Sequence, residues 1–200
     1  MSIARRVQLV EELFHQLELE SAQFEKASGL YCVSGCGKCC TYPDVEASPL
    51  EFLPWAFHIF QNGEAETTLA KLKETDSPTC SIYKSFSSTG QGTCSNYKYR
   101  GLICRLFGFA ANTDKYGNLR LATCKIIKEG QAENYKTTAE AISKGLHVPV
   151  FTEYYMQLNQ IDFHLGNVIL PVNKAQIRAL EEVLQYYAYR PFPDSDTTSV

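Results

Sequence analysis

The sequence of 200 residues contains no long apolar run. Its longest strongly apolar stretch without a charged residue covers residues 52–60, includes Pro54 and His58, and is too short to cross a bilayer. The sequence also contains no run of Lys and Arg, and its 19 basic and 22 acidic residues leave a net charge of −3. We therefore expect neither a membrane span nor nucleic-acid binding.

Motifs of common enzyme classes are absent as well. There is no Gly-rich phosphate loop, no GxSxG sequence and no HExxH sequence. The histidines are scattered and form no short ligand pair, which favours ordinary solvated or hydrogen-bonded imidazoles at His15, His58, His147 and His164. The motif search leaves open whether the protein is an enzyme.

The composition, 44% hydrophobic and 20% charged, is typical of a folded globular chain. Apolar positions recur at intervals of four and three near the N-terminus and predict one long helix that Gly29 ends. The positions of this face are Ile3, Val7, Val10, Phe14, Leu17, Ser21 and Phe24. The sequence Ser48-Pro-Leu-Glu51 combines a capping Ser, Pro at the first helical position and a Glu three residues after the cap. It predicts a helix over 49–61 that ends at Asn62-Gly63.

Weaker signals predict the remaining elements. They are a short helix over 64–75, an exposed loop over 85–93, a β-hairpin joining 106–110 to 119–123, and helices over 132–144, 150–162 and 174–189. Asn173 is the expected cap of the last helix. The predicted fold class is mostly α, of the α+β type, with a helical frame, a small β-hairpin and an irregular cysteine-rich metal-binding core.

The length favours one domain over residues 1–190. Within it we distinguish a cysteine-cluster region, 31–125, from C-terminal helices, 132–189. We expect residues 191–200 to be a disordered tail. We see no internal repeat.

Cysteine is the unusual residue. Eight cysteines occur in the chain, and four of them fall within nine residues, at Cys32, Cys36, Cys39 and Cys40. The N-terminal segment carries charges where a secretory signal needs an apolar stretch, so we expect a cytoplasmic protein with reduced thiols. Disulfides and scattered free thiols are alternatives, but the crowding, with two cysteines adjacent, favours thiolates that hold a metal.

The other candidate ligands lie downstream, at Cys80, Cys94, Cys104 and Cys124. Four thiolates suit a tetrahedral Zn²⁺ site, and they suit a 4Fe–4S cluster equally well, so the spacing does not choose between zinc and iron. Eight cysteines would fill one centre or two. Four thiolates leave a negative charge, which the neighbouring cations Lys38, Arg100 and Arg105 would offset by hydrogen bonds to sulfur.

Two blocks of residues carry a resemblance. Cys36-Gly-Lys-Cys39-Cys40 and, later, Cys94-Ser-Asn-Tyr-Lys-Tyr-Arg100-Gly-Leu-Ile-Cys104-Arg-Leu-Phe107 are similar to the YkgJ-type CxxCxxCC cysteine-cluster family. The resemblance covers about 31–125 and implies a zinc- or iron-chelating domain. It transfers most directly to Cys36, Cys39, Cys40, Cys94 and Cys104, and Cys80 matches a cysteine that the family often has between the blocks.

The sequence departs from the family pattern at two places. Cys32 precedes Cys36 by one residue more than usual, and Gly101 replaces the usual proline. The family also includes flagellin lysine N-methylases, which implies an alternative function as an iron–sulfur enzyme of redox or methyl-transfer chemistry. The spacing of Cys32, Cys36 and Cys39 is that of radical S-adenosylmethionine enzymes too, although Lys38 replaces their aromatic residue.

The leading hypothesis is therefore a cytoplasmic protein that binds zinc or iron through its cysteines. Its expected partner is the metal ion, and the sequence does not identify a protein partner. An interaction module that docks a partner on the N-terminal helix, around residues 3–24, is a further alternative.

Overall fold

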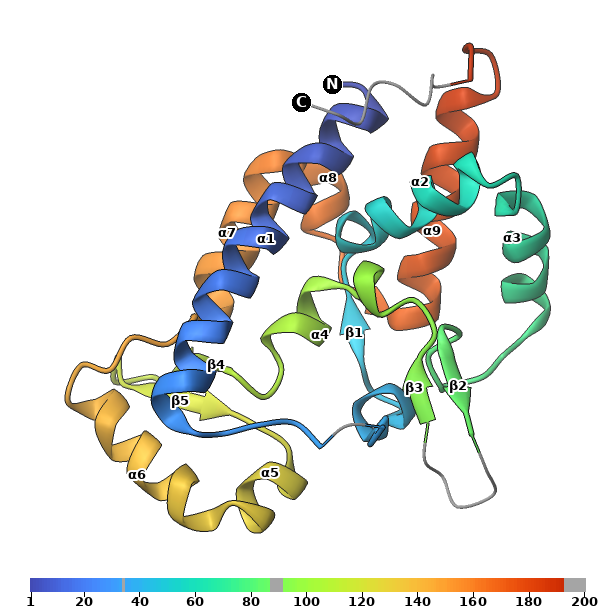
Figure 1. The fold of residues 1–200 in the computed structure, drawn as a ribbon. Helices are drawn as coiled ribbons and strands as arrows, with labels where there is room; N and C mark the ends of the chain where they lie inside the picture. Colours follow the sequence, from blue (N-terminus) through green and yellow to red (C-terminus); the bar gives the residue numbers. More distant parts are fainter. Residues whose placement is uncertain (34, 87–91, 193–200) are drawn as a thin grey trace.

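The computed structural model describes residues 1–33, 35–86 and 92–192 (Figure 1). The predicted N-terminal helix is confirmed as α1, Ile3–Ser28. Ser2 caps it by accepting a hydrogen bond from the Arg5 N–H, and Gly29 ends it in the left-handed conformation at φ 65°. Its predicted apolar face is buried, apart from Ser21, which is half-buried. The helix runs along one side of the molecule, from the N-terminus to the level of β4 and β5 (Figure 1).

The capping box at Ser48 is confirmed. The Ser48 side chain accepts a hydrogen bond from the Glu51 N–H, and the Glu51 side chain accepts one from the Ser48 N–H. The first turn is a 3₁₀ helix, η2, Pro49–Phe52, which continues into α2, Leu53–Gln61. The short helix predicted next is α3, Ala65–Glu74. Almost all of η2 and α2 is buried, because this segment is apolar around its whole circumference and packs between α1 and α9.

The predicted C-terminal helices are confirmed as α6, Ala132–Ser143, α7, Phe151–Ile161, and α9, Val172–Tyr187. The cap predicted at Asn173 is wrong. The helix begins one residue before it, at Val172, with Pro171 in the cap position. Proline already holds a φ suited to helix entry, so Asn173 lies inside the first turn and its amide is free for other contacts.

Several short elements were not predicted, because three to six residues are too few to show a helical period. These are η1, Lys38–Thr41, η3, Tyr97–Tyr99, α4, Leu102–Leu106, α5, Lys125–Gly130, and α8, Phe163–Gly166. The segment 106–110 was expected to be entirely strand, but Leu106 instead closes α4 and the strand starts at Ala110.

The strands form small antiparallel pairs. The predicted hairpin is confirmed as β4, Ala110–Thr113, with β5, Leu119–Ala122, and Ala110 is opposite Ala122. A second pair joins β2, Tyr83–Ser85, to β3, Gly92–Cys94, so Ser85, Gly92 and Thr93 of the expected loop are strand residues instead. Residues 87–91 of that expected loop lie outside the described part of the chain. A third pair joins β1, Glu46–Ala47, to β6, Leu170–Pro171.

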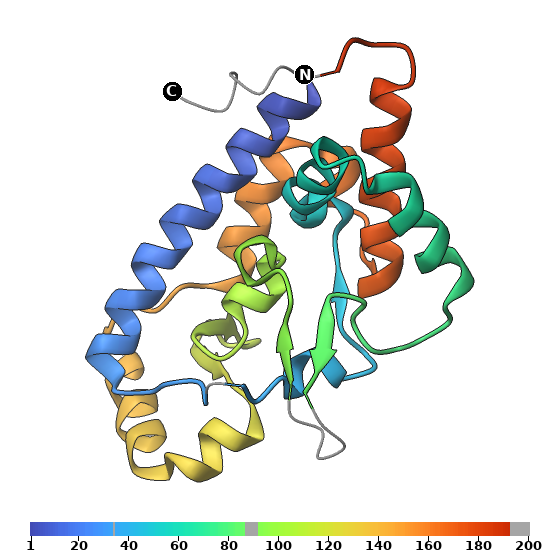
Figure 2. The same ribbon diagram turned by 45° about the vertical axis from the view of Figure 1, so that its right-hand side comes forward.

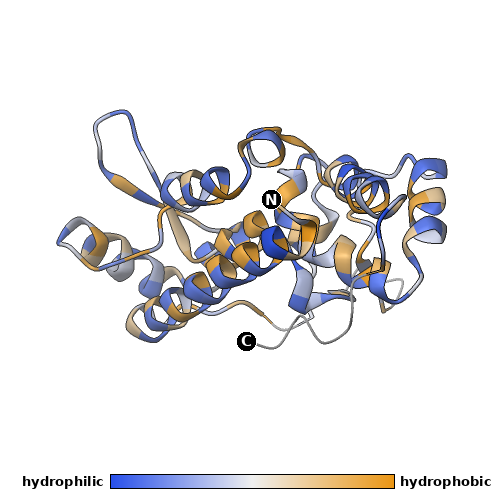
Figure 3. Ribbon diagram, turned by 90° about the horizontal axis from the view of Figure 1, so that it is seen from above, coloured by the Kyte–Doolittle hydropathy of each residue, from blue (hydrophilic) through white to orange (hydrophobic). Residues whose placement is uncertain are grey.

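The main core fills the space between α1, α2, α7 and α9, and a smaller cluster of Phe24, Ala111, Ile142 and Val148 joins the end of α1 to α6. The long helices carry apolar and polar residues on different sides (Figure 3). After α1 the chain passes below α4 to η1, which lies beside β2 and β3 (Figure 2). No helix of the described residues is both long enough and apolar enough to cross a membrane.

Candidate metal centre

The eight cysteines come from irregular or short elements around η1. Cys32 and Cys36 lie in the loop after α1, Cys39 and Cys40 in η1, Cys80 before β2, Cys94 at the end of β3, Cys104 in α4 and Cys124 at the start of α5. All eight are free thiols, so the structure contains none of the disulfides considered as an alternative.

Backbone contacts hold the η1 loop, which we define as residues 30–33 and 35–41, against the β2–β3 hairpin. The Cys80 N–H donates to the Cys40 carbonyl at 3.1 Å, and the Gly92 N–H donates to the Gly35 carbonyl at 3.3 Å. Gly37 adopts φ 58°, and a Cβ there would come within 2.8 Å of the Gly92 carbonyl oxygen. A glycine is therefore required for this close approach. The contact brings the second cysteine segment to the first across forty residues of sequence.

Cys80 is also held from α9. The Gln176 amide donates to the Cys80 sulfur at 3.4 Å, and the Ser81 hydroxyl donates to the Gln176 side-chain oxygen at 2.5 Å. Asn173 donates to the carbonyls of Ser77 and Thr79 at 2.8 and 2.9 Å. Gln176 is fully buried. Sequence analysis identified Asn173 only as a helix cap and missed Ser81 and Gln176, although a glutamine within the apolar face of a predicted helix was a signal available in the sequence.

A buried carboxylate positions the segment of Cys104. Glu51 is 0% exposed, and it accepts hydrogen bonds from the Ser48 N–H at 2.6 Å and from the Ile103 N–H at 2.8 Å. Burial raises the pKa of Glu51 to about 7 despite these hydrogen bonds, which lower it. Sequence analysis identified Glu51 as half of a capping box, but not as the group that holds the start of α4.

The thiols interact electrostatically across the segments. A hydrogen bond from the Cys40 thiol lowers the pKa of Cys39 to about 6, and the same bond, followed by burial and the neighbouring thiols, raises the pKa of Cys40. Burial raises the pKa of Cys104, and Glu51, Cys80, Cys39 and Cys94 raise it further. The thiols of η1, the β2–β3 hairpin and α4 are therefore within electrostatic range of one another.

A second set of interactions extends toward α5. Burial raises the pKa of Cys32, and the thiols of Cys39, Cys36 and Cys124 raise it further. The Cys124 sulfur lies at the cap of α5, where it accepts a hydrogen bond from the Ile127 N–H at 3.4 Å. Cys39 takes part in both sets, which makes it the thiol common to all the cysteine segments.

The three predicted cations differ in their surroundings. Arg100 lowers the pKa of Cys32, Cys39 and Cys94, its guanidinium lies 4.0 Å from the centre of the Tyr97 ring, and its buried Nε has no partner among the described residues. The Arg105 guanidinium instead bonds the Glu18 carboxylate and the carbonyls of Lys98 and Arg100. Lys38 is exposed. Arg100 is thus the cation that acts most directly on the thiols.

The donor set fits a soft metal in its chemistry. The side chains that interact electrostatically across these segments are thiols, the ligands that zinc and iron–sulfur clusters prefer. The unpaired Arg100 Nε suits a site that gains negative charge. Within the described ranges, no group of three or more Cys, His, Asp or Glu side chains is already arranged to hold a metal ion. Binding would therefore draw sulfurs together from positions that the fold has brought near.

Comparison with known proteins finds a match to the part of the chain that contains the cysteines. A family model described as "CxxCxxCC: Putative zinc- or iron-chelating domain" matches residues 31–139, more than half of the chain. No curated protein and no solved structure matches the sequence or the fold. The matched range contains all eight cysteines, from Cys32 to Cys124. The chain belongs to the CxxCxxCC family of zinc- or iron-chelating domains.

Proposed function

We propose that this protein chelates zinc or iron through cysteine thiolates from the η1 loop, the β2–β3 hairpin, α4 and the start of α5. The observation that carries the proposal is the contact between the first two cysteine segments, in which the Cys80 N–H donates to the Cys40 carbonyl at 3.1 Å, and the mutual effects of the thiols on their pKa values support it. Packing alone gives no reason for so many partly buried thiols to gather in one place. A cytoplasmic location would keep them reduced and available.

The interactions support two groups of four ligands. The first is Cys40, Cys80, Cys94 and Cys104, which surround the contact between η1 and the hairpin. The second is Cys32, Cys36, Cys39 and Cys124, which lie between the η1 loop and α5. Each group has the number of thiolates that a tetrahedral zinc or an iron–sulfur cluster takes. The adjacent residues Cys39 and Cys40 would then belong to different groups and join them.

Charge balance gives Arg100 a role in this proposal. Each group of four thiolates around a divalent ion carries about two negative charges, which are costly to bury unless a cation lies near. Arg100 already acts on thiols of both groups, Cys32 and Cys39 on one side and Cys94 on the other. A bound zinc would crosslink segments that are distant in sequence, and an iron–sulfur cluster would add electron transfer.

Metal content is the first test. The protein should be purified without oxygen, and its zinc, iron and acid-labile sulfide should be measured per chain. We expect about two metal ions, or one to two clusters, for eight thiolate ligands. Stoichiometric sulfide would identify iron–sulfur chemistry and would favour the redox or methyl-transfer enzyme implied by the family resemblance. A protein without metal, whose eight thiols all react freely, would disprove the proposal.

Single Cys→Ser variants test the division into groups. Cys104→Ser should remove the metal of the first group and leave that of the second, whereas Cys36→Ser should do the reverse. If each variant loses the whole metal content, the eight cysteines serve one centre and the two-group arrangement is wrong. If neither variant loses metal or stability, the cysteines are not ligands and an interaction module on α1 becomes the better hypothesis.

A further inference from the structure

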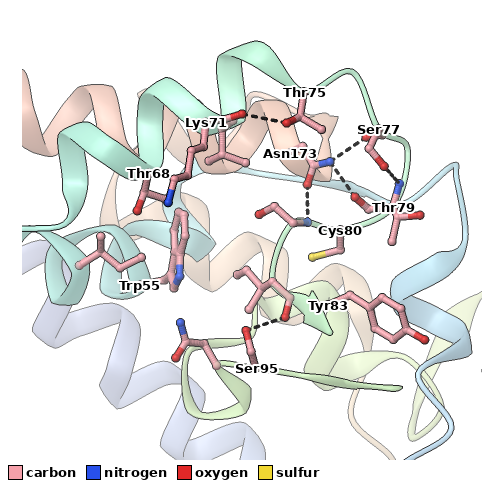
Figure 4. A pocket seen from close by; sticks show the side chains of 15 residues that line it. Trp55, Thr68, Lys71, Thr75, Ser77, Thr79, Cys80, Tyr83, Ser95 and Asn173 are labelled. Atoms are coloured by element: carbon pink, nitrogen blue, oxygen red, sulfur yellow. Dashed lines mark hydrogen bonds between the residues drawn. The ribbon is translucent and has the colours of Figure 1, made fainter. Parts of the chain in front are cut away.

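A cavity of about 470 Å³ lies beside Cys80, on the side of the β2–β3 hairpin that faces α2 and α3 (Figure 4). This volume is within the range of sites for small organic molecules. The apolar part of its wall comes from Ile59, Leu72 and Ile82. The cavity is not needed to hold a metal, since Cys80 is the one proposed ligand among the residues that line it.

The most informative residue of the cavity is Trp55. Its side chain lines the cavity, it is only 2% exposed, and its indole Nε1 has no hydrogen-bond partner in the described part of the chain. The ring packs edge-on against Phe52, with centroids 6.5 Å apart. An indole N–H can only donate, and a buried donor without an acceptor is unfavourable. Nε1 is itself buried, so an occupant with an acceptor oxygen would satisfy it after a small turn of the indole ring.

The charge at the rim is positive. Lys71 of α3 lines the cavity, and its amine end lies beside Thr68, on the same side as Trp55 (Figure 4). No salt bridge engages Lys71 among the described residues, whereas Lys73, two positions later, pairs with Glu181 at 2.6 Å. The lining contains no Asp or Glu. A lysine without a counter-ion at the mouth of such a cavity favours an anion.

The opposite wall is held in place by contacts already described. Asn173 fixes the segment from Ser77 to Thr79, and the Ser95 hydroxyl donates to the Ile82 carbonyl at 2.8 Å. Figure 4 shows the Cys80 sulfur and Asn173 across the cavity from Trp55. Because Asn173 is bonded to the Ser77 and Thr79 carbonyls and Gln176 to the Cys80 sulfur, this wall is formed before any ligand arrives, which lowers the cost of binding.

We propose that this cavity binds a small organic anion, a carboxylate or a phosphate ester with a compact apolar body. One acceptor oxygen of the anion would accept a hydrogen bond from the Trp55 N–H, and the anion would face the Lys71 ammonium group. Its apolar part would contact Ile59, Leu72 and Ile82. The site goes beyond metal chelation, and it places the bound anion next to Cys80 and hence beside the proposed metal centre.

Trp55 is the only tryptophan of the chain, so its fluorescence reports on this cavity directly. The full chain should be titrated with phenylacetate, with phenyl phosphate and with phenylacetamide, which has the shape of phenylacetate without its charge. We expect saturable changes with one or both anions and at least about tenfold weaker binding of the amide. The stronger anion distinguishes carboxylate from phosphate recognition. No saturation with either anion at about 10 mM, where even a weak site fills, would overturn the proposal.

Two variants assign the contacts by calorimetry. Lys71→Met should weaken anion binding about tenfold, and Trp55→Phe, which keeps the ring but removes the N–H, should weaken it several-fold. Lys73→Met is the matched control on the same helix and should bind as the unmodified protein does. Equal weakening by Lys71→Met and Lys73→Met, or equal affinity for phenylacetate and phenylacetamide, would show that no specific anion site exists. Titrations of metal-free and zinc-loaded protein separate this result from the proposed chelation, because the anion contacts include no metal ligand.

Discussion

The Glu51 carboxylate accepts a 2.8 Å hydrogen bond from the backbone N–H of Ile103, so a buried acid in one short helix holds the helix that carries Cys104. The other oxygen of Glu51 accepts from the N–H and the hydroxyl of Ser48. One side chain thus caps η2 and ties it to α4 across fifty residues of sequence. The position of Cys104 depends on this connection.

Glu51 should make stability depend on pH. Its pKa is about 7 in the folded protein and 4.5 ordinarily, so the folded state binds the proton more tightly. The stability that this adds is complete below pH 4.5 and is lost as the pH rises to 7, a change of about 3 kcal/mol. Glu51→Gln cannot ionise. Urea titrations at several pH values should give the unfolding free energies of the unmodified protein and of Glu51→Gln. The difference between them, unmodified minus variant, should fall as the pH rises from 4.5 to 7. If the two proteins show parallel pH dependence, Glu51 is not the titrating group.

Gly101 should not tolerate a side chain. A Cβ at this position would lie 2.8 Å from the Glu51 carboxylate and 3.0 Å from the Phe52 ring. Gly101→Ala should therefore lower the unfolding free energy by about 1–3 kcal/mol, measured by denaturant unfolding. Gly130→Ala is the control, because a Cβ there meets nothing within 4 Å. Since proline also has a Cβ, the residue usual in the family should be unfavourable here too, and a neutral Gly101→Ala would show that Glu51 moves aside easily.

The anchor of the Cys80 loop on α9 can be removed at Asn173. Asn173→Ala loses the hydrogen bonds to the Ser77 and Thr79 carbonyls and the one accepted from the Ser81 N–H at 2.8 Å. We expect a loss of about 1–3 kcal/mol of stability and faster reaction of Cys80 with a thiol reagent in metal-free protein. Arg178→Ala, at an exposed position on the same helix, is the control. Unchanged Cys80 reactivity in Asn173→Ala would mean that Gln176 and the Cys40 carbonyl suffice.

Metal removal should destabilise the fold. Chelation should lower the melting temperature, and addition of Zn²⁺ should restore it. An ion that binds only the folded state stabilises that state, and the stabilisation grows with the concentration of the ion. At a thousand times the dissociation constant the gain is about 4 kcal/mol. The measurement is a thermal melt at several zinc concentrations. An Arg100→Met variant should bind the metal more weakly, and a melting temperature that does not respond to chelator or zinc would contradict a structural role.

Local patterns predicted the elements whose signals are complete within one segment. The four-and-three spacing from Ile3 to Phe24 gave α1, the capping residues Ser48 and Glu51 gave the start of the next helix, and the turn at 114–118 placed the β4–β5 hairpin. The cysteine spacing also indicated a family that the family model confirms. The individual ligands and the choice of metal stay predictions.

Other features could not be predicted because their cause lies in distant residues. The cap assigned to Asn173 was wrong, because the helix begins one residue earlier, after Pro171, and the sequence does not show that the Asn173 side-chain oxygen accepts from the Ser81 N–H. The β2–β3 pair is too short to signal itself and is supported by contacts with the η1 loop, such as that between Gly92 and Gly35. Lys71 has no distinctive sequence context, and the place of Gln176 on an apolar helix face does not show its partner Cys80, so the surroundings of both residues give them their roles.

The sequence by itself determined the helical frame and the sulfur-rich chemistry of this protein, because periodicity, capping residues and ligand type are local properties. The tertiary structure alone decided which thiols are neighbours, which cation acts on them, and where a cavity opens beside Cys80. The physical reason is that electrostatic interactions and burial depend on distances in space, which are set by contacts such as that between Cys80 and Cys40 rather than by separation along the chain.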